Sequence, residues 1–279
     1  MYTLENCEAL WAEAGKQGTP AERMARTEKW FPYYAYLAKS AASVPFQLPE
    51  KANPIVAHML REEILTPGST VLDIGAGTGN FSLDFARHCR GVTALEPCGD
   101  CLSVLENRAA AWGLANMQTV RAMWEEYRPE AAFDVTFSAM CPAICSTEEL
   151  RRMEAMTKKT CCLVTVMRGS YDKHRKAMMR ELGIQPQGGM TSEAIHYINA
   201  LYLMGRQVNV KCFTARHVTK VPAQRVLEQY PIYFSIFGVP EKESVQFLRD
   251  YLERNAADGF LEDESLLKQA LIYWDVPKR

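Results

Sequence analysis

Three glycines at alternate positions, preceded by an acidic residue, form the part of the sequence best suited to bind a ligand. Asp73 is followed by Gly75, Gly77 and Gly79, and the segment lies between a short apolar run and an amphipathic helical pattern. Glycines in such a turn let a ligand approach the backbone closely. The carboxylate of Asp73 would repel a pyrophosphate and attract an ammonium group. The loop therefore favours a ligand with a cationic end and no phosphate.

The spacing also separates two cofactor classes. A dinucleotide fingerprint requires the pattern G-x-G-x-x-G, but Asn80 stands where its last glycine would fall. A second carboxylate, Glu96, ends the next apolar run, 17 residues after Gly79. There it can accept hydrogen bonds from both ribose hydroxyls of an adenosine. Together, Asp73, the glycines and Glu96 predict a site for adenosine linked to an amino acid.

This pattern resembles the first motif of the class I S-adenosylmethionine-dependent methyltransferases, acidic-x-G-x-G-x-G, over about residues 65–170. The resemblance implies that Asp73 holds the methionine part of the cofactor and that Glu96 binds the ribose. The family usually has an acidic residue for the adenine amino group, but Met123 stands there. Met123 and Trp124 are expected to sandwich the adenine, with Glu125 a weaker polar candidate. The expected cofactor-binding residues are Asp73, Gly75, Ala76, Gly77, Thr78, Gly79, Glu96, Pro97, Met123, Trp124, Ser138 and Ala139.

The loop after the fourth predicted strand should face the transferred methyl group, because ligands of doubly wound folds bind at the carboxyl ends of the strands. It reads Met140-Cys141-Pro142-Ala143. Amino-group methyltransferases that act on nucleobases or glutamine often carry Asn-Pro-Pro-Tyr there, so that branch is disfavoured. No catalytic residue stands out, and the weak candidates are His196, Tyr34 and Cys141. A histidine on a helix face such as His196 is more often structural.

Two cysteine pairs follow neighbouring strands, Cys98 with Cys101 and Cys141 with Cys145. A four-thiolate metal or iron–sulfur site is conceivable, since C-x-x-C is a common ligand pair. Free cysteine also behaves as a small buried hydrophobic residue, and the sequence favours that interpretation. No metal is predicted.

Five aromatic residues fall within seven positions, and they allow two interpretations. As a lid they would cover the site and place aromatic faces near the cofactor sulfonium. As a packing element they would dock the N-terminal helices on the core. The sequence leaves both open. These residues are Trp30, Phe31, Tyr33, Tyr34 and Tyr36. Three histidines, His58, His88 and His174, are expected on exposed helices.

Short apolar runs that alternate with amphipathic helices predict parallel βαβ units. The expected strands are Thr70–Ile74, Val92–Leu95, Met117–Val120, Phe133–Ser138 and Cys161–Met167, followed by an antiparallel last pair, Val208–Val221 and Leu267–Val276. The predicted fold is a doubly wound, Rossmann-like α/β sheet of seven mostly parallel strands. Residues 1–60 form an N-terminal helical cap, and residues 61–279 form the S-adenosylmethionine-binding domain, with a helical insertion at about 170–206.

Composition narrows the partners. Of the 279 residues 48% are hydrophobic, and 32 basic side chains against 33 acidic ones leave a net charge of −1, which disfavours nucleic acid. No run approaches the length of about 18 apolar residues needed to span a bilayer. The first residues show no export signal, so a cytoplasmic monomer or homodimer is expected. The expected activity is methyl transfer from S-adenosylmethionine to a small molecule. Alternatives are a binding protein without activity, use of the cofactor as an aminoalkyl donor, or an NAD-dependent oxidoreductase.

Overall fold

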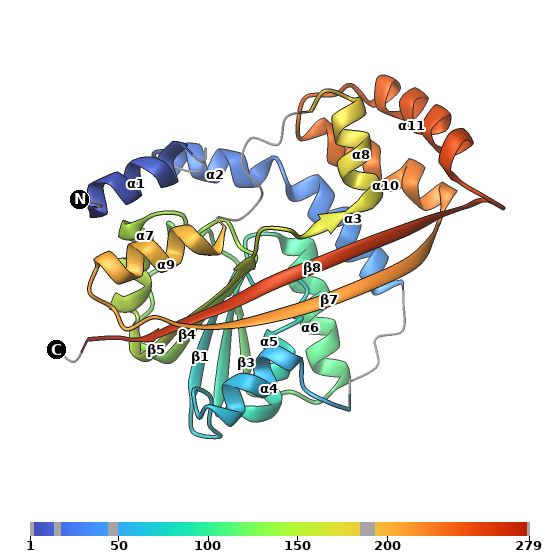
Figure 1. The fold of residues 1–279 in the computed structure, drawn as a ribbon. Coiled ribbons are helices and arrows are strands. Elements are labelled where there is room, and N and C mark those ends of the chain that lie inside the picture. Colours follow the sequence, from blue (N-terminus) through green and yellow to red (C-terminus); the bar gives the residue numbers. More distant parts are fainter. Residues whose placement is uncertain (1–2, 14–17, 44–49, 185–192, 278–279) are drawn as a thin grey trace.

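The parallel part of the sheet comes from five apolar segments. The computed structural model describes residues 3–13, 18–43, 50–184 and 193–277 (Figure 1). In this part of the chain eight strands form one sheet in the order β3-β2-β1-β4-β5-β8-β6, and β7 pairs with β8. The five parallel strands are β1 (Thr70–Ile74), β2 (Gly91–Leu95), β3 (Met117–Val120), β4 (Phe133–Ala139) and β5 (Thr157–Val166).

Both faces of this sheet are covered, which explains why its strands are apolar on both sides. Val71 faces the cluster that also holds Phe85, while Leu72 and Ile74 face the cluster that holds Trp11. One face carries α4 (Pro54–Arg61), α5 (Ser82–His88) and α6 (Gly99–Ala111); the other carries α1 (Leu4–Glu13), α7 (Thr147–Ala155) and α9 (Ala194–Leu203). No helix of the described residues is long and apolar enough to cross a membrane.

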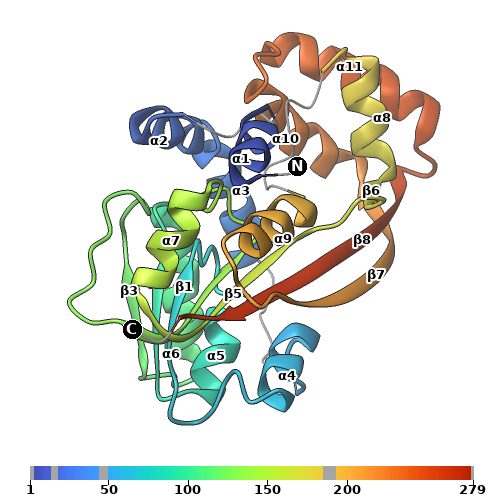
Figure 2. The ribbon, with the colours of Figure 1, turned by 60° about the vertical axis from the view of Figure 1, so that its left-hand side comes forward.

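A long antiparallel ribbon extends the sheet beyond the parallel strands. It consists of β7 (Asn209–Pro222) and β8 (Phe260–Asp275), and β8 also pairs antiparallel with β5 and with the short β6 (Tyr171–Asp172). The far end of the ribbon carries α8 (Lys173–Glu181), α10 (Ala223–Ser235) and α11 (Glu241–Asn255), which share their own hydrophobic core (Figures 1 and 2). We call these three helices and the ribbon end the distal lobe.

The predicted Rossmann-like class and the antiparallel strand pair are confirmed. The sheet has eight described strands where seven were predicted, because β6 is an added two-residue pairing. The predicted insertion at 170–206 contains α8 and α9, and residues 185–192 of it lie outside the described residues. A second pair of helices, α10 and α11, lies between the last two strands, where α10 was not predicted.

The N-terminal segment packs against three parts of the molecule. Helix α1 lies beside α9, whereas α2 (Pro20–Glu28) and α3 (Phe31–Ala42) run along the carboxyl ends of the strands (Figures 1 and 2). Helix α3 contacts both α6 and α10, so it bridges the parallel half of the sheet and the distal lobe. Helix α4, inside the predicted 1–60 cap, packs with α5 on the lower face of the sheet. The helices that lie over the strand ends are thus α2 and α3.

Candidate active site

The strand register brings the predicted site segments to one edge of the sheet. Asp73 pairs with Ala94 of β2 on one side and with Phe137 of β4 on the other, and Ile74 pairs with Ser138. The loops after β1, β2 and β4 therefore leave the sheet side by side. Such an edge, at the carboxyl ends of neighbouring parallel strands, is where doubly wound folds bind ligands.

The glycine loop is shaped by three positive φ angles, +75° at Gly75, +56° at Gly77 and +91° at Gly79, which side chains rarely adopt. A Cβ on Gly75 would lie 2.5 Å from the sulfur of Cys141, and one on Gly79 would lie 2.9 Å from Cγ of Leu105. A Cβ on Gly77 would meet nothing within 4 Å. Gly75 and Gly79 are thus required by close packing, whereas Gly77 leaves its backbone open to a ligand.

Glu96 stands directly beside that open backbone. The amide N–H of Gly77 donates to Glu96 Oε2 at 2.9 Å, and the amide N–H of Cys98 donates to Oε1 at 2.9 Å. Glu96 is 7% exposed, and this burial raises its pKa, while the two amide hydrogen bonds oppose the rise. Each carboxylate oxygen keeps a second acceptor position. Glu96 is therefore held in place and can still accept from a diol.

Asp73 lies beneath the loop at the end of β1 and is 2% exposed. Its carboxylate accepts a hydrogen bond of 2.5 Å from Ser82 Oγ, at the first residue of α5. Burial raises the pKa of Asp73 to about 7, and the nearby Glu96 adds to this rise while the Ser82 hydrogen bond opposes it. Ser82 was not among the predicted site residues, because one serine between apolar neighbours gives no signal of its partner.

The loop after β4 closes the same site from the other side. Ser138 is 2% exposed, and its hydroxyl donates to the carbonyl of Ile74 at 3.2 Å. Met140 has a φ of +53°, a strained value for a side chain of its size. The next residue, Cys141, packs against Gly75. Burial raises the pKa of the Cys141 thiol to about 12. Cys141 is therefore a neutral thiol at physiological pH and unsuited to act as a base.

A family comparison identifies this arrangement. Residues 71–160 match the family model described as a methyltransferase domain. The match covers the glycine loop, Glu96 and the loop after β4. Residues 71–160 therefore form a methyltransferase domain. The predicted family is thus confirmed, and the cofactor of that family is S-adenosylmethionine.

Other similar proteins cover most of the chain. A Haemophilus influenzae protein of uncharacterised function is 23% identical over 249 residues, which cover 86% of this chain and 88% of that protein. A Bacillus halodurans structure, provisionally assigned as a methyltransferase, is 15% identical with a TM-score of 0.53 and covers 81% of this chain and 100% of its own. The YcgJ protein of Bacillus subtilis is 15% identical with a TM-score of 0.50, and the similarity covers 80% of this chain and 100% of YcgJ. The two structural similarities concern the fold.

In the methyltransferase domain, the stretch expected to hold adenine is anchored to α7 and α2. Trp124 is 3% exposed, its indole N–H donates to Glu149, and the guanidinium of Arg152 lies 4.2 Å from its ring centroid. Arg23 of α2 pairs with Glu149 at 2.7 Å and with Glu125 at 3.1 Å. Met123, 8% exposed, belongs to none of the hydrophobic clusters. Adenine stacking stays a prediction, which Met123 suits better than Trp124, since Arg152 covers one face of the indole.

The remaining predicted cofactor residues follow the loop. Ala76 N–H donates to the carbonyl of Leu95 at 3.0 Å, and the carbonyl of Thr78 accepts from Arg108 at 3.1 Å. Pro97 connects Glu96 to the start of α6, and Ala139 ends β4. Their contacts with a cofactor stay predictions.

Tyr34 is, after Cys141, the second weak catalytic candidate close to the site. Burial raises its pKa, and the neighbouring Cys141 and Glu96 add to the rise. Its ring stacks on Trp30 with centroids 6.0 Å apart. Among the described residues its hydroxyl has no hydrogen-bond partner. Tyr34 therefore offers a neutral phenol that can donate to an acceptor molecule, and the raised pKa makes it a poor base.

His196 lies between α1 and α9, where its ring stacks on Trp11 at a centroid distance of 6.2 Å. A catalytic role for it stays a prediction. The expectation that His58 and His174 are exposed is wrong, because they are 7% and 4% exposed. The ring of His174 is held between the Tyr251 hydroxyl, at 2.8 Å, and the carbonyl of Glu262, at 2.9 Å. These bonds satisfy both ring nitrogens and allow burial inside the distal lobe.

Protonation of Asp73 should govern cofactor binding below neutral pH. A carboxylate whose pKa is raised to about 7 loses its charge as the pH falls through that value, and a neutral Asp73 cannot pair with an ammonium group. The affinity for S-adenosylhomocysteine, titrated calorimetrically, should thus fall by up to about tenfold per unit as the pH drops below about 7. Asp73→Asn should bind weakly at every pH and lose this dependence. An unchanged pH profile in that variant would place the titrating group elsewhere.

Asp73 also has an opposite effect on the stability of the ligand-free protein. Its folded-state pKa is raised above the unfolded value, so its stabilising contribution is present below the unfolded pKa of about 3.9 and is lost as the pH rises through about 7. The two effects have opposite signs, which distinguishes loss of binding from acid unfolding.

Proposed function

We propose that the chain transfers the methyl group of S-adenosylmethionine to a small molecule, in the site at the carboxyl ends of β1, β2 and β4. The observation that carries the proposal is the pairing of Glu96 with the open backbone of Gly77 at 2.9 Å. A fixed buried carboxylate beside a glycine with open space around it suits the ribose and the adjoining chain of an adenosyl amino acid. Asp73 below the loop suits its ammonium group.

The chain's own residues mainly bind the cofactor and the methyl acceptor and orient them toward each other. The cofactor supplies an electrophilic methyl group when bound. Around its expected position stand neutral groups, the Cys141 thiol and the Tyr34 phenol, whose pKa values are both raised. Neither can take a proton from an acceptor at neutral pH. Methyl transfer is therefore expected to rest on proximity and orientation, with an acceptor nucleophile that is already deprotonated or loses its proton to water.

The proposed acceptor is a small molecule, and the expected state is a cytoplasmic monomer or homodimer without nucleic-acid or membrane partners. The net charge of −1 supports this choice, since no basic excess is available for phosphate contacts. An aromatic cluster that begins near the site supports an organic acceptor. Tyr34, which interacts with Cys141 and Glu96, stacks on Trp30. Trp30 in turn contacts Tyr233 and Phe237 with centroid distances of 6.0 and 6.2 Å.

Thermal unfolding tests the cofactor. A ligand that binds only the folded protein stabilises it by about 2.7 kcal/mol at a concentration one hundred times its dissociation constant. S-adenosylmethionine and S-adenosylhomocysteine should raise the melting temperature, and NAD should not. Stabilisation by NAD alone would refute the proposal.

The reaction type needs a second measurement. Incubation of a metabolite extract with cofactor labelled at the methyl carbon should give labelled small molecules, detected by mass spectrometry. A labelled aminoalkyl product would instead indicate the alternative donor chemistry. Binding without any labelled product across extracts would favour a binding protein.

A further inference from the structure

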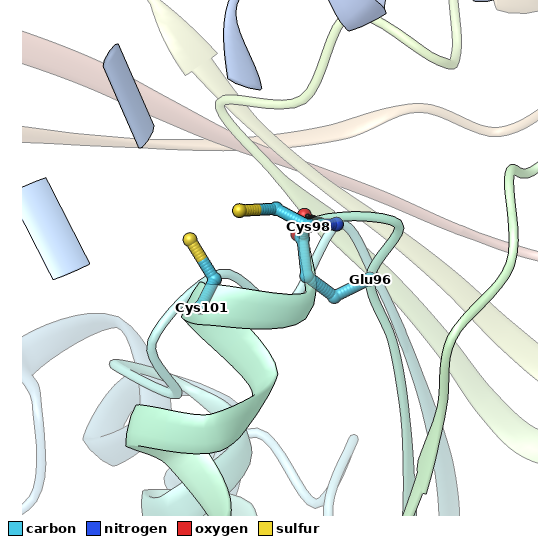
Figure 3. A group of neighbouring side chains, drawn as sticks. All are labelled: Glu96, Cys98 and Cys101. Carbon is cyan, nitrogen blue, oxygen red and sulfur yellow. Dashed lines mark hydrogen bonds between the residues drawn. The ribbon is translucent and has the colours of Figure 1, made fainter. Parts of the chain in front are cut away.

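Two cysteines stand side by side in the first turn of α6, next to Glu96 (Figure 3). Cys98 is the N-cap residue and Cys101 lies three positions later, and their side chains point toward each other. Both sulfur atoms and a carboxylate oxygen of Glu96 lie within 4.8 Å of one another. The cysteines are 3% and 6% exposed and are covered by α3 through Tyr34 and Ala38.

The two thiols are not equivalent. A hydrogen bond from Cys101 lowers the pKa of Cys98, against the opposing effects of burial, Glu96 and Asp100. The same bond and burial raise the pKa of Cys101. Cys98 is thus the thiol of the pair that more readily forms a thiolate, beside a protonated partner. Burial raises the pKa of other cysteines, namely Cys89, Cys141, Cys145, Cys161 and Cys162.

Dithiol chemistry suits this group better than metal binding. With Glu96 the cysteines would make three ligands. Both oxygens of Glu96, however, already accept backbone N–H groups at 2.9 Å, from Gly77 and Cys98. A metal ion would take the second acceptor positions of Glu96 that the ribose needs, whereas a bond between the two sulfurs leaves these positions free.

We propose that Cys98 and Cys101 form a reversible disulfide that lowers the affinity of the neighbouring Glu96 site for its adenosyl ligand. The disulfide itself is independent of the proposed function, and only the change in affinity rests on it. The co-reactant is a small disulfide of the glutathione type. The Cys98 thiolate attacks one of its sulfurs, forming a mixed disulfide and releasing one thiolate. Cys101 then loses its proton and attacks the Cys98 sulfur, which forms the internal disulfide and releases the second thiol.

Bond formation must move Cys98. A disulfide bond measures about 2.05 Å, well below the contact distance of two separate sulfurs, so the side chain of Cys98 has to turn toward Cys101. The amide of the same residue holds Glu96 at 2.9 Å, and we expect the turn of the side chain to displace it. Loss of one hydrogen bond to a charged group should weaken adenosyl binding about tenfold.

The experiment compares the full chain reduced with dithiothreitol and oxidised with excess glutathione disulfide. Free thiols are alkylated, and peptide mass mapping locates any disulfide. S-adenosylhomocysteine is titrated into both forms, and zinc and iron are measured. Cys212→Ser, at an exposed cysteine of β7, is the matched control and should respond as the parent protein does. Cys101→Ser should stop at a mixed disulfide on Cys98 or stay reduced, and should form no internal bond.

The expected result is a disulfide between Cys98 and Cys101, about tenfold weaker binding, and full recovery on reduction. Absence of that disulfide at every glutathione ratio would overturn the proposal, as would a disulfide that leaves the affinity unchanged. One zinc or iron per chain, held through Cys98, would replace it with a metal site. If neither form binds S-adenosylhomocysteine, the proposed function fails, while the peptide map still decides whether the disulfide exists.

Discussion

Replacing Glu96 by glutamine is expected to weaken binding of S-adenosylhomocysteine by about 1.5–3 kcal/mol, or roughly 10- to 150-fold. The carboxylate accepts one backbone N–H on each oxygen. A glutamine must turn its NH2 group toward one of these donors, which breaks that bond and removes an acceptor for the ribose. Calorimetric titration of reduced protein measures the effect.

Glu126→Gln is the matched control, because Glu126 is exposed and belongs to the same half of the molecule. Its affinity should equal that of the parent protein. The free energy of unfolding of both variants, from urea titration, shows whether the fold is kept. A Glu96→Gln protein that folds and binds normally would mean that the ribose is held by another group.

Two neighbouring tyrosines of α3 should give opposite results, which separates packing from a direct role at the site. Tyr33 is 9% exposed, its hydroxyl accepts from Gln229 at 2.9 Å, and its ring lies 5.3 Å from that of Tyr233. Tyr33→Ala should therefore cost about 3 kcal/mol of unfolding free energy. Tyr34→Phe removes a hydroxyl without a described partner, so stability should change by less than about 0.5 kcal/mol, while methyl transfer slows.

The control for Tyr33→Ala is the conservative variant Tyr33→Phe. Tyr33→Phe keeps the ring and should recover most of the stability lost in Tyr33→Ala. If Tyr34→Phe transfers methyl groups at the parental rate, the phenol has no part in holding the acceptor, and α3 serves only as a packing element.

All five strands of the parallel half could be predicted, although β5 begins at Thr157, four residues before the predicted Cys161. Its strands are buried on both faces, so they read as short apolar runs, and glycine or proline stands near their ends. Thr70–Ile74 and Met117–Val120 were predicted with the observed bounds. The glycine loop and Glu96 could be located for the same reason, since their chemistry depends on spacing along the chain.

The distal lobe could not be predicted as well, because its elements depend on partners far away in the sequence. Strand β8 begins at Phe260 and not at the predicted Leu267, since its first part carries the acidic run Glu262, Asp263 and Glu264. The backbone of this run pairs with β7. The side chain of Glu264 also forms an ion pair of 2.6 Å with Arg216 of β7. Helix α10 contains Pro231, and proline is normally disfavoured in a helix interior. The sequence therefore gave no prediction of this helix.

The sequence did not predict the site contacts that form only when separate helices pack together. Arg23 reaches Glu149 across 126 positions, and Ser82 meets Asp73 only after α5 has packed on the sheet. The C-x-x-C spacing of Cys98 and Cys101 was visible, but the covering of the first turn of α6 by α3 was not. The spacing of residues along the chain does not reveal which helix packs over another.

The pairing of β8 with β5 has a consequence for how the chain assembles. Val166 of β5 pairs with Gln269, about a hundred positions further along, so the two strands meet only after a slow, long-range search. Until then β5 presents an unpaired edge lined by Cys162 and Val164, which end up 0% and 2% exposed. Such an edge can recruit strands of other nascent molecules. The same long ribbon that supports the distal lobe therefore makes self-association a hazard during folding.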